Sequence, residues 1–261
     1  MPNFYEETVR TGGADLVVVK GGTGKPLLIL HDELGYTGWM TWNERLAEQR
    51  TLLIPLQPGY GRTPRVEWLS SYRDLAGFYS RMLREHHLDP IDVIGFSAGG
   101  FTAAEMAAAD PHLFRRMVLV APMGIKPSEE EIMDFFSMTI RSHLRATVAD
   151  TVNTAEFGKI YGGEMTPEQF EAFEDARTET ARLGWDPFMH NPSLPCLLEG
   201  TNVPTLLIRG TRDELVPHDC IRAYKKALPD AQVAEIEGVG HRPEIENQAE
   251  FVRVTRDFLG A

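Results

Sequence analysis

The chain has 261 residues, of which 43% are hydrophobic and 25% are charged, and its formal net charge at pH 7 is -12. This length and composition exclude a disordered chain and fit one large domain with a sizeable hydrophobic core. Because an acidic protein of this kind would repel a phosphate backbone, we do not expect nucleic acid as a partner.

The first residues, the apolar runs and the cysteines of the chain indicate the compartment in which we expect the protein to act. The first residues lack the basic and apolar regions of a secretory signal peptide. No apolar run approaches the roughly 20 residues that a membrane helix needs, so no membrane association is expected. Cys196 and Cys220 have no C-x-x-C spacing and are expected to stay reduced. We therefore expect a cytoplasmic protein, a monomer or a homodimer, that acts on a small molecule.

Short apolar runs alternate with helical patterns, which is typical of a mostly parallel sheet flanked by helices. The expected strands, rich in valine, isoleucine and leucine, are 16–20, 27–30, 51–56, 91–96, 117–121, 205–209 and 232–236. The expected helices between them are 41–49, 71–87, 97–109, 217–228 and 243–259. The glycine-rich stretch 21–26 fails the Walker pattern and is predicted to be a hairpin-like turn. The sequence thus predicts an α/β fold around a central sheet of about eight strands.

One long segment, residues 123–200, breaks this alternation because it contains no convincing strand. Its stretches 129–145, 146–161 and 166–183 look helical, and the segment is too long for a loop in a compact domain. An insertion at the end of a strand in an open sheet overhangs the crevice where ligands bind. We therefore predict a helical lid over 123–200, inserted after the sixth strand, and a core made of 1–122 and 201–261.

A G-x-S-x-G motif, Gly95-Phe96-Ser97-Ala98-Gly99, lies between a predicted strand and a predicted helix. In that context a sharp turn lifts the serine hydroxyl out of the sheet, and the flanking glycines let the backbone pack closely. The three fixed letters alone are weak evidence, since a glycine-rich strand-to-helix turn would also match. With its context, the motif predicts Ser97 as a nucleophile.

A serine hydroxyl needs a base to take its proton, and in this architecture the acid and the histidine follow it in the chain. Asp213 lies just past the strand 205–209, and His241 follows the last strand after a glycine. Glu214 is a rival acid, and the other histidines, such as His143 in the insertion, fit less well. We predict Asp213 and His241 as the partners of the serine. No cluster has metal-ligand spacing, so neither a metal nor another cofactor is expected.

Acyl transfer also needs hydrogen-bond donors for the developing oxyanion. The residue after the nucleophile supplies one backbone N–H group, here that of Ala98. The second is expected from the loop after the strand 27–30, where Glu33 occupies the donor position. The predicted oxyanion hole therefore consists of the N–H groups of Ala98 and Glu33.

Several separated motifs resemble those of the α/β-hydrolase superfamily, in its lid-bearing group of carboxylesterases and C–C bond hydrolases. They span nearly the whole chain and lie at 28–31, 58–62, 95–99, 210–213 and 240–243. The family usually has His-Gly-x-x-Gly after the third strand, whereas this chain has Asp32 in place of that glycine, followed by Glu33. Gln57 stands where the family often has aspartate. The two carboxylates would oppose an oxyanion or an anionic substrate unless they point away or bind a cationic or hydroxylated group.

The resemblance and the motifs together predict a serine hydrolase that forms an acyl-enzyme on Ser97. The expected substrate is a medium-sized, mainly apolar ester or lactone that is uncharged or cationic. Candidate substrate-binding residues are Asp32, Leu34, Trp39, Phe96, Met123 and Trp185. Two alternatives stay open: a C–C bond hydrolase or lyase with the same triad, and a non-catalytic ligand-binding receptor on the same fold.

Overall fold

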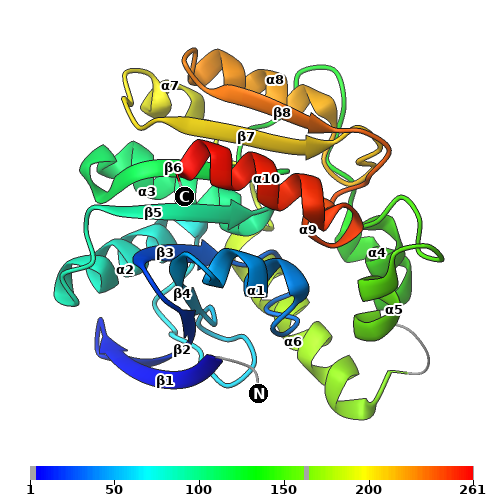
Figure 1. Cartoon of the computed structure of the whole chain (residues 1–261), viewed down its shortest axis with the longest axis horizontal. Helices are drawn as coiled ribbons and strands as arrows, with labels where there is room; N and C mark the ends of the chain where they lie inside the picture. Colours follow the sequence, from blue (N-terminus) through cyan, green and yellow to red (C-terminus); the bar gives the residue numbers. More distant parts are fainter. Residues whose placement is uncertain (1–3, 162–164, 261) are drawn as a thin grey trace.

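The computed structural model describes residues 4–161 and 165–260. An eight-stranded sheet with the order β1-β2-β4-β3-β5-β6-β7-β8 forms its centre (Figure 1). Only the pairings of β1 with β2 and of β2 with β4 are antiparallel, so the predicted mostly parallel sheet is confirmed. The strands are β1 (Phe4–Thr11), β2 (Ala14–Gly22), β3 (Lys25–Leu30), β4 (Arg50–Pro55), β5 (Ile91–Phe96), β6 (Phe114–Val120), β7 (Thr205–Gly210) and β8 (Gln232–Ile236).

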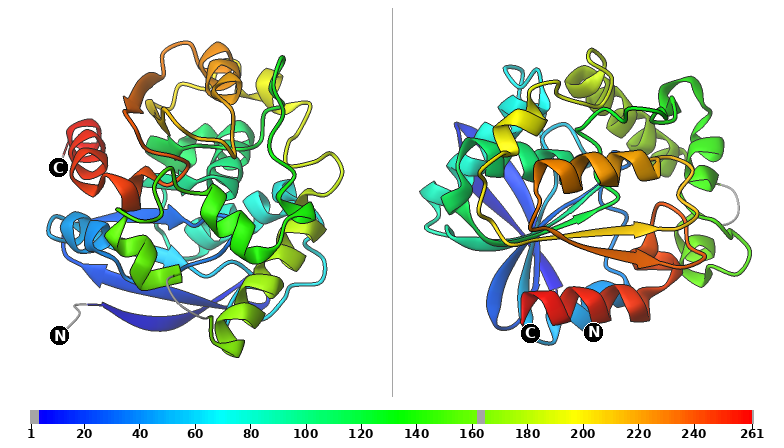
Figure 2. Two further views of the ribbon diagram at one scale, coloured as in Figure 1. Left: turned by 90° about the vertical axis from the view of Figure 1, so that its right-hand side faces the viewer. Right: turned by 90° about the horizontal axis from the view of Figure 1, so that it is seen from above.

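Helices cover both faces of the sheet, as the two further views show (Figure 2). One face carries α1 (Thr41–Ala47), α9 (Pro243–Glu246) and α10 (Gln248–Leu259). The other carries α2 (Tyr72–Glu85), α3 (Ala98–Ala109), α7 (Leu194–Leu198) and α8 (His218–Ala227), and the short 3-10 turn η1 (Pro111–Leu113) follows α3. Successive side chains of a strand enter opposite faces, so Val93 and Ile94 of β5 belong to two separate apolar clusters.

Two sequence predictions about the first strands were wrong. The strand β1 was missed because its residues are mostly exposed or half-buried, so it lacks the apolar run of a buried strand. The stretch 21–26 is not a hairpin-like turn, because β4 lies between β2 and β3. Thr51 pairs with Gly22 and Arg50 pairs with Lys25, which places both flanks of that turn against the same strand.

The helical segment after β6 is confirmed, and of its three predicted helices 166–183 keeps its length while 129–145 and 146–161 are shorter than predicted. A 3-10 turn η2 (Phe135–Ser137) and the helix α4 (Ile140–Ala146) replace the predicted 129–145, because the Thr139 side chain caps α4. Only α5 (Ala155–Tyr161) and α6 (Pro167–Gly184) follow as longer elements before α7. These helices gather beyond the end of the sheet toward which the parallel strands point (Figure 1).

The division into a core and an inserted lid stays a prediction, and residues 1–3, 162–164 and 261 of those ranges lie outside the described residues. The predicted single helix 243–259 is broken at Asn247, whose side chain caps α10. None of the helices in the described ranges is both long and apolar enough to cross a bilayer.

Candidate active site

The turn between β5 and α3 holds Ser97 in a strained conformation. Its φ of 49° and ψ of -110° fall in the left-handed half of the map, which a serine rarely adopts. A Cβ atom on Gly99 would lie 2.2 Å from the carbonyl oxygen of Leu30, so only glycine lets α3 begin this close to β3. Ser97 itself is buried, and its N–H group donates to the carbonyl of Val120 over 2.9 Å. Backbone strain of this kind, held by close packing, is typical of functional sites.

Asp213 and His241, predicted as partners from the sequence, lie together. Oδ2 of Asp213 is 2.9 Å from Nδ1 of His241, while Oδ1 accepts the N–H groups of Leu215 and Val216, each over 2.9 Å. Because a carboxylate only accepts, Nδ1 carries the imidazole proton and Nε2 is left as an acceptor. Nε2 is buried and has no hydrogen-bond partner within the described residues. The rival acid Glu214 is exposed and points to solvent.

Close packing brings the loops that carry the acid and the histidine together. A Cβ atom on Gly210, at the end of β7, would lie 2.1 Å from the carbonyl oxygen of Gly240. Glu246, at the end of α9, accepts the N–H group of Gly240 over 2.6 Å and that of Ala149 over 2.8 Å. Glu246 therefore fixes the residue before His241 and ties this loop to the helical segment after β6.

The electrostatic surroundings of His241 favour its protonated form. Burial, the largest single influence, lowers the pKa of the imidazole, whereas the charge and the hydrogen bond of Asp213 raise it. The charges of Glu33 and Asp32 act in the same direction, and together they bring the pKa of His241 to about 9. The free imidazole is therefore a stronger base than an ordinary histidine.

The loop after β3 is fixed from both sides. His31 bridges it to the end of β4, because its Nδ1 lies 2.9 Å from the Asp32 carbonyl and its Nε2 accepts the N–H group of Gln57 over 3.0 Å. The hydroxyl of Thr180 in α6 donates to the Glu33 carbonyl over 3.0 Å. Ala98, the first residue of α3, has no intrahelical acceptor for its N–H group. The backbone at both predicted oxyanion donors is thus held in place.

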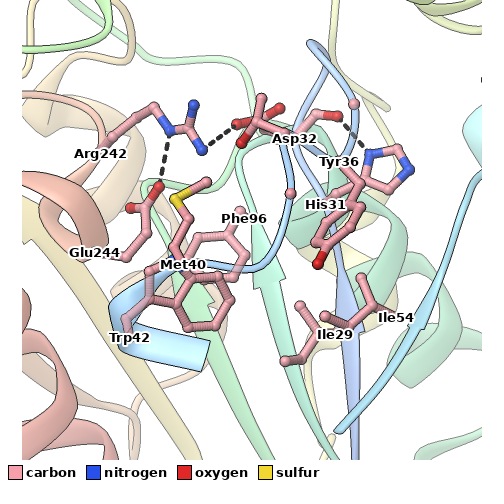
Figure 3. A pocket seen from close by; sticks show the side chains of 13 residues that line it. Ile29, His31, Asp32, Tyr36, Met40, Trp42, Ile54, Phe96, Arg242 and Glu244 are labelled. Carbon is pink, nitrogen blue, oxygen red and sulfur yellow. Dashed lines mark hydrogen bonds and ion pairs between the residues drawn. The ribbon is translucent and has the colours of Figure 1, made fainter. Parts of the chain in front are cut away.

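The side chain of Asp32 points to a buried arginine (Figure 3). Its Oδ2 lies 3.5 Å from Nη2 of Arg242, and Arg242 donates from Nε to Glu244 over 2.8 Å. All three side chains are buried beside a cavity of about 20 Å³, which has room for one water molecule and no more. The cluster links the loop after β3 to the residue that follows His241. Asp32 is therefore placed to position the loop, and its carboxylate is engaged with Arg242, away from the predicted substrate-binding role.

The side chain of Glu33 points the other way, toward the residues of the site. Oε1 lies 3.3 Å from Nε2 of His143 in α4, and both side chains are almost fully buried. Burial raises the pKa of Glu33, but nearby His143, the charge of His241 and the Ser97 hydroxyl together lower it to about 2. Glu33 is therefore a buried carboxylate that borders both the serine and the histidine.

A family model described as the alpha/beta hydrolase family matches residues 27–254. The chain belongs to the alpha/beta hydrolase family.

The names of the relatives of this alpha/beta hydrolase indicate different substrates. It is 25% identical to a 2-hydroxy-6-oxo-2,4-heptadienoate hydrolase of Pseudomonas putida, over 97% of this chain and 95% of that protein. It is 23% identical to a pimeloyl acyl-carrier-protein methyl ester esterase of Yersinia pseudotuberculosis, over 99% and 98% of the two chains. The solved structure of a meta-cleavage product hydrolase has the same fold, with a TM-score of 0.81 and 19% identity over 97% of each chain.

The other residues predicted to bind substrate in this hydrolase have different surroundings. Met123 lies next to Ser97, because its N–H group donates to the Ser97 carbonyl over 3.2 Å. Phe96 packs on Trp42 with ring centroids 5.3 Å apart, inside the apolar cluster that also contains Leu34. Both of these side chains therefore belong to the core on the α1 and α10 face.

The two predicted tryptophans lie farther out. Trp39 stacks on Phe4 of β1, with ring centroids 4.8 Å apart and planes 11° apart. Trp185 is 65% exposed, and its nearest aromatic contact is Phe136 at 5.7 Å. The ring contacts of both indoles are thus with aromatic residues outside the predicted triad and oxyanion hole.

Sequence reasoning missed His143, which it set aside as one of several histidines in the insertion. The residue lies on the buried side of α4 together with Ile140 and Leu144, and its ring stacks on Phe135 at 4.7 Å. A histidine at an apolar helical position was the available signal, since such a side chain needs a polar partner. Within the described part of the chain, no group of three or more His, Cys, Asp or Glu residues is arranged to hold a metal ion.

Proposed function

We propose that this alpha/beta hydrolase is a serine hydrolase that cleaves a carboxylic ester or lactone through an acyl-enzyme on Ser97. The observation that carries the proposal is the buried Asp213–His241 hydrogen bond of 2.9 Å, which leaves Nε2 of the imidazole unpaired among the described residues. Ser97 and His241 both border Glu33 closely enough to lower its pKa, which supports their acting on the same substrate. Nucleophilic catalysis needs an acceptor nitrogen for the serine proton, and the Ser97 hydroxyl is likewise buried without a hydrogen-bond partner among the described residues.

The reaction follows from the hydrogen-bond roles of these groups. Nε2 of His241 takes the hydroxyl proton of Ser97 as Oγ bonds to the carbonyl carbon, and Asp213 stabilises the imidazolium. The imidazolium then gives that proton to the leaving alcohol as the ester bond breaks. His241 then takes a proton from water as the water oxygen attacks the acyl-enzyme carbonyl. The imidazolium returns that proton to Oγ of Ser97 as the acyl bond breaks and the acid leaves.

The backbone N–H groups of Glu33 and Ala98 are proposed to hold the oxyanion. The Thr180 hydroxyl bond to the Glu33 carbonyl and the helical start at Ala98 support this role, because they fix both peptide groups. Donors that are already oriented need no reorganisation during the reaction, and losing one typically costs about 100- to 1000-fold in kcat.

The substrate we propose is a medium-sized, mainly apolar small molecule that is uncharged or cationic, acted on in the cytoplasm by a monomer or homodimer. The Glu33 carboxylate beside the serine supports this choice, because it would repel an anionic group. A C–C bond hydrolase is the second candidate, favoured by the relative named for a heptadienoate substrate. That substrate is a carboxylate, so the charge of Glu33 makes the ester the better proposal.

The test is to label and assay the protein with the nucleophile removed. Ser97→Ala is expected to abolish both fluorophosphonate labelling and ester turnover, with a loss on the order of a million-fold in kcat. Ser193→Ala, at an exposed serine, is the matched control and should keep both. Retained turnover in Ser97→Ala would disprove the proposal. A wild-type protein that is unlabelled and inert would favour a binding role on this fold.

A parallel assay separates the two reaction classes. The wild-type protein is offered simple esters and a meta-cleavage product in matched amounts. We expect the esters to be hydrolysed with the higher kcat/KM, because only the meta-cleavage product brings a carboxylate near Glu33. The reverse order would establish the C–C bond hydrolase instead.

A further inference from the structure

The polar side of the candidate site contains more hydrogen-bonding capacity than the protein itself uses. Glu33 is 1% exposed, yet neither carboxylate oxygen has a hydrogen-bond partner among the described residues. The hydroxyl of Tyr72 is likewise buried without a partner in that part of the chain. Burial raises the pKa of Tyr72, and the charges of Tyr60 and Glu33 act in the same direction. A buried acceptor without a partner needs an explanation, and a group that binds there is one such explanation.

The other acidic side chains around the site already have their counterparts. Asp32 faces Arg242, and Asp213 has two backbone N–H groups and His241. Glu33 has the imidazole of His143 at 3.3 Å, a contact without hydrogen-bond geometry, and the His241 imidazole and the Ser97 hydroxyl close enough to lower its pKa. Within the described residues the counter-charges that these contacts bring to Glu33 are therefore imidazoles, which are cations only when protonated, and His241 must be neutral when it acts as the base.

The position of this charge creates a conflict in the proposed reaction. The backbone N–H group of Glu33 is the proposed oxyanion donor, so the negative oxygen would develop close to the carboxylate of the same residue. Like charges at short range in a site shielded from water repel strongly. A cation between them would remove the repulsion and stabilise the transition state more than the ground state.

We propose that the Glu33 carboxylate is a subsite for a protonated amino group of the substrate, next to the carbonyl that Ser97 attacks. An ammonium group has three N–H donors and no acceptor, which suits the unpaired oxygens of Glu33 and the Tyr72 hydroxyl. This inference rests on the proposed ester hydrolysis and names its substrate class: amino-substituted esters or lactones.

A charged His143 is the rival source of the positive charge. Its Nε2 lies 3.3 Å from Glu33, but both ring nitrogens are buried without a hydrogen-bond partner in the described residues. Its ring stacks on Phe135 at 4.7 Å on the buried side of α4. If His143 nevertheless neutralises Glu33, the enzyme will show no preference for an amine, and that outcome contradicts the proposal.

The decisive assay compares ethyl butyrates that carry a methyl, hydroxyl, ammonium or carboxylate group on the β-carbon. At neutral pH we expect the ammonium ester to exceed its methyl isostere by at least about 10-fold in kcat/KM, and the carboxylate ester to be the poorest. Glu33→Gln should lower the ammonium-to-methyl ratio by at least about 10-fold and improve the carboxylate ester. The control Glu214→Gln, at an exposed carboxylate beside the acid loop, should keep the wild-type ratio.

A second measurement needs no variant and guards against misfolding of Glu33→Gln. The wild-type protein hydrolyses the methyl-substituted ethyl butyrate, and butylammonium or butyrate is added as an inhibitor. Stronger inhibition by the cation supports the subsite, and equal or stronger inhibition by the anion disproves it. Fluorophosphonate labelling distinguishes a failure of the amine subsite from a failure of the proposed serine hydrolase function. Labelled Ser97 without preference for the amine overturns this inference alone, whereas an unlabelled, inert protein overturns the proposed function.

Discussion

The loops that carry Asp213 and His241 satisfy the charges they contain, whereas the loop after β3 leaves one charge unsatisfied. Asp213 uses both carboxylate oxygens, one for two backbone N–H groups and one for the imidazole. Glu33, equally buried, has no hydrogen bond within the described residues and is bordered by the Ser97 hydroxyl and the imidazoles of His143 and His241. Asp213 therefore needs no partner from the substrate, whereas we propose that the substrate supplies the partner of Glu33.

The same contrast separates the two neighbouring carboxylates of the loop itself. Asp32 points to Arg242 and so ties the loop to the residue after His241 (Figure 3). Glu33 points to the serine and to the helical segment after β6. One acidic residue therefore holds the site together while its neighbour sets the charge that a substrate meets.

The largest expected effect comes from a change at Asp213, whose carboxylate oxygens both have partners. Asp213→Asn keeps the size of the side chain but can donate to Nδ1 instead of accepting from it, which favours the wrong tautomer of His241. We expect kcat for a simple ester to fall by about 10,000-fold. Glu214→Gln, next in the chain but exposed, is the control and should stay near wild type. A loss of less than about 10-fold in Asp213→Asn would show that another group orients the histidine.

The next effect is on stability and tests whether Asp32 has a structural role. Arg242→Met leaves two buried carboxylates, Asp32 and Glu244, without their common cation, which typically costs about 3–5 kcal/mol. Urea unfolding should show this loss. Arg10→Met, in an exposed pair with Asp15, is the control and should cost less than about 1 kcal/mol. Equal effects of the two changes would argue against a structural role for the buried cluster.

A smaller effect concerns the pH at which the site works. His241 must be neutral to act as a base, and its pKa is raised to about 9, so kcat/KM for an uncharged ester should rise with pH up to that value. Since the charge of Glu33 favours the imidazolium, Glu33→Gln should move this rise to lower pH. The pH dependence of kcat/KM for both proteins is the measurement, and an unshifted profile would place Glu33 farther from the histidine.

The raised pKa of His241 also affects the stability of the fold. This stability decreases with rising pH, whereas the activity increases. The pKa of His241 is higher in the folded protein than its ordinary value of 6.5, so folding favours the protonated form. Its contribution to stability is complete below pH 6.5 and is lost as the pH rises through about 9. The most active pH range is therefore one in which this source of stability is being lost.

Much of this site could be predicted from the sequence because its geometry is local. The strand, turn and helix around Ser97 follow from glycines and apolar runs that are neighbours in the chain. The meeting of Asp213 with His241 followed from their places after two parallel strands, whose ends share one edge of the sheet. Their catalytic roles, like the oxyanion hole at Ala98 and Glu33, stay predictions.

The directions of side chains could not be predicted in the same way. Asp32 and Glu33 are adjacent in the sequence, and their opposite orientations depend on Arg242 and His143, which only the folded chain brings near. The same holds for β1, which pairs through its backbone with β2 although few of its side chains are buried. Tertiary partners, rather than local patterns, decided each of these features.

The smallest expected effect lies at Trp185, predicted from the sequence to bind substrate. Its side chain is 65% exposed, so Trp185→Ala removes little buried surface and should change stability by no more than about 0.5 kcal/mol. The ratio of kcat/KM for the ammonium-substituted ester to kcat/KM for the methyl-substituted ester should also stay at its wild-type value. The reason is that the indole is not among the groups that border Glu33. Steady-state kinetics with both esters is the check. A change in that ratio as large as in Glu33→Gln would mean that the exposed rim, and not the buried carboxylate, selects the substrate.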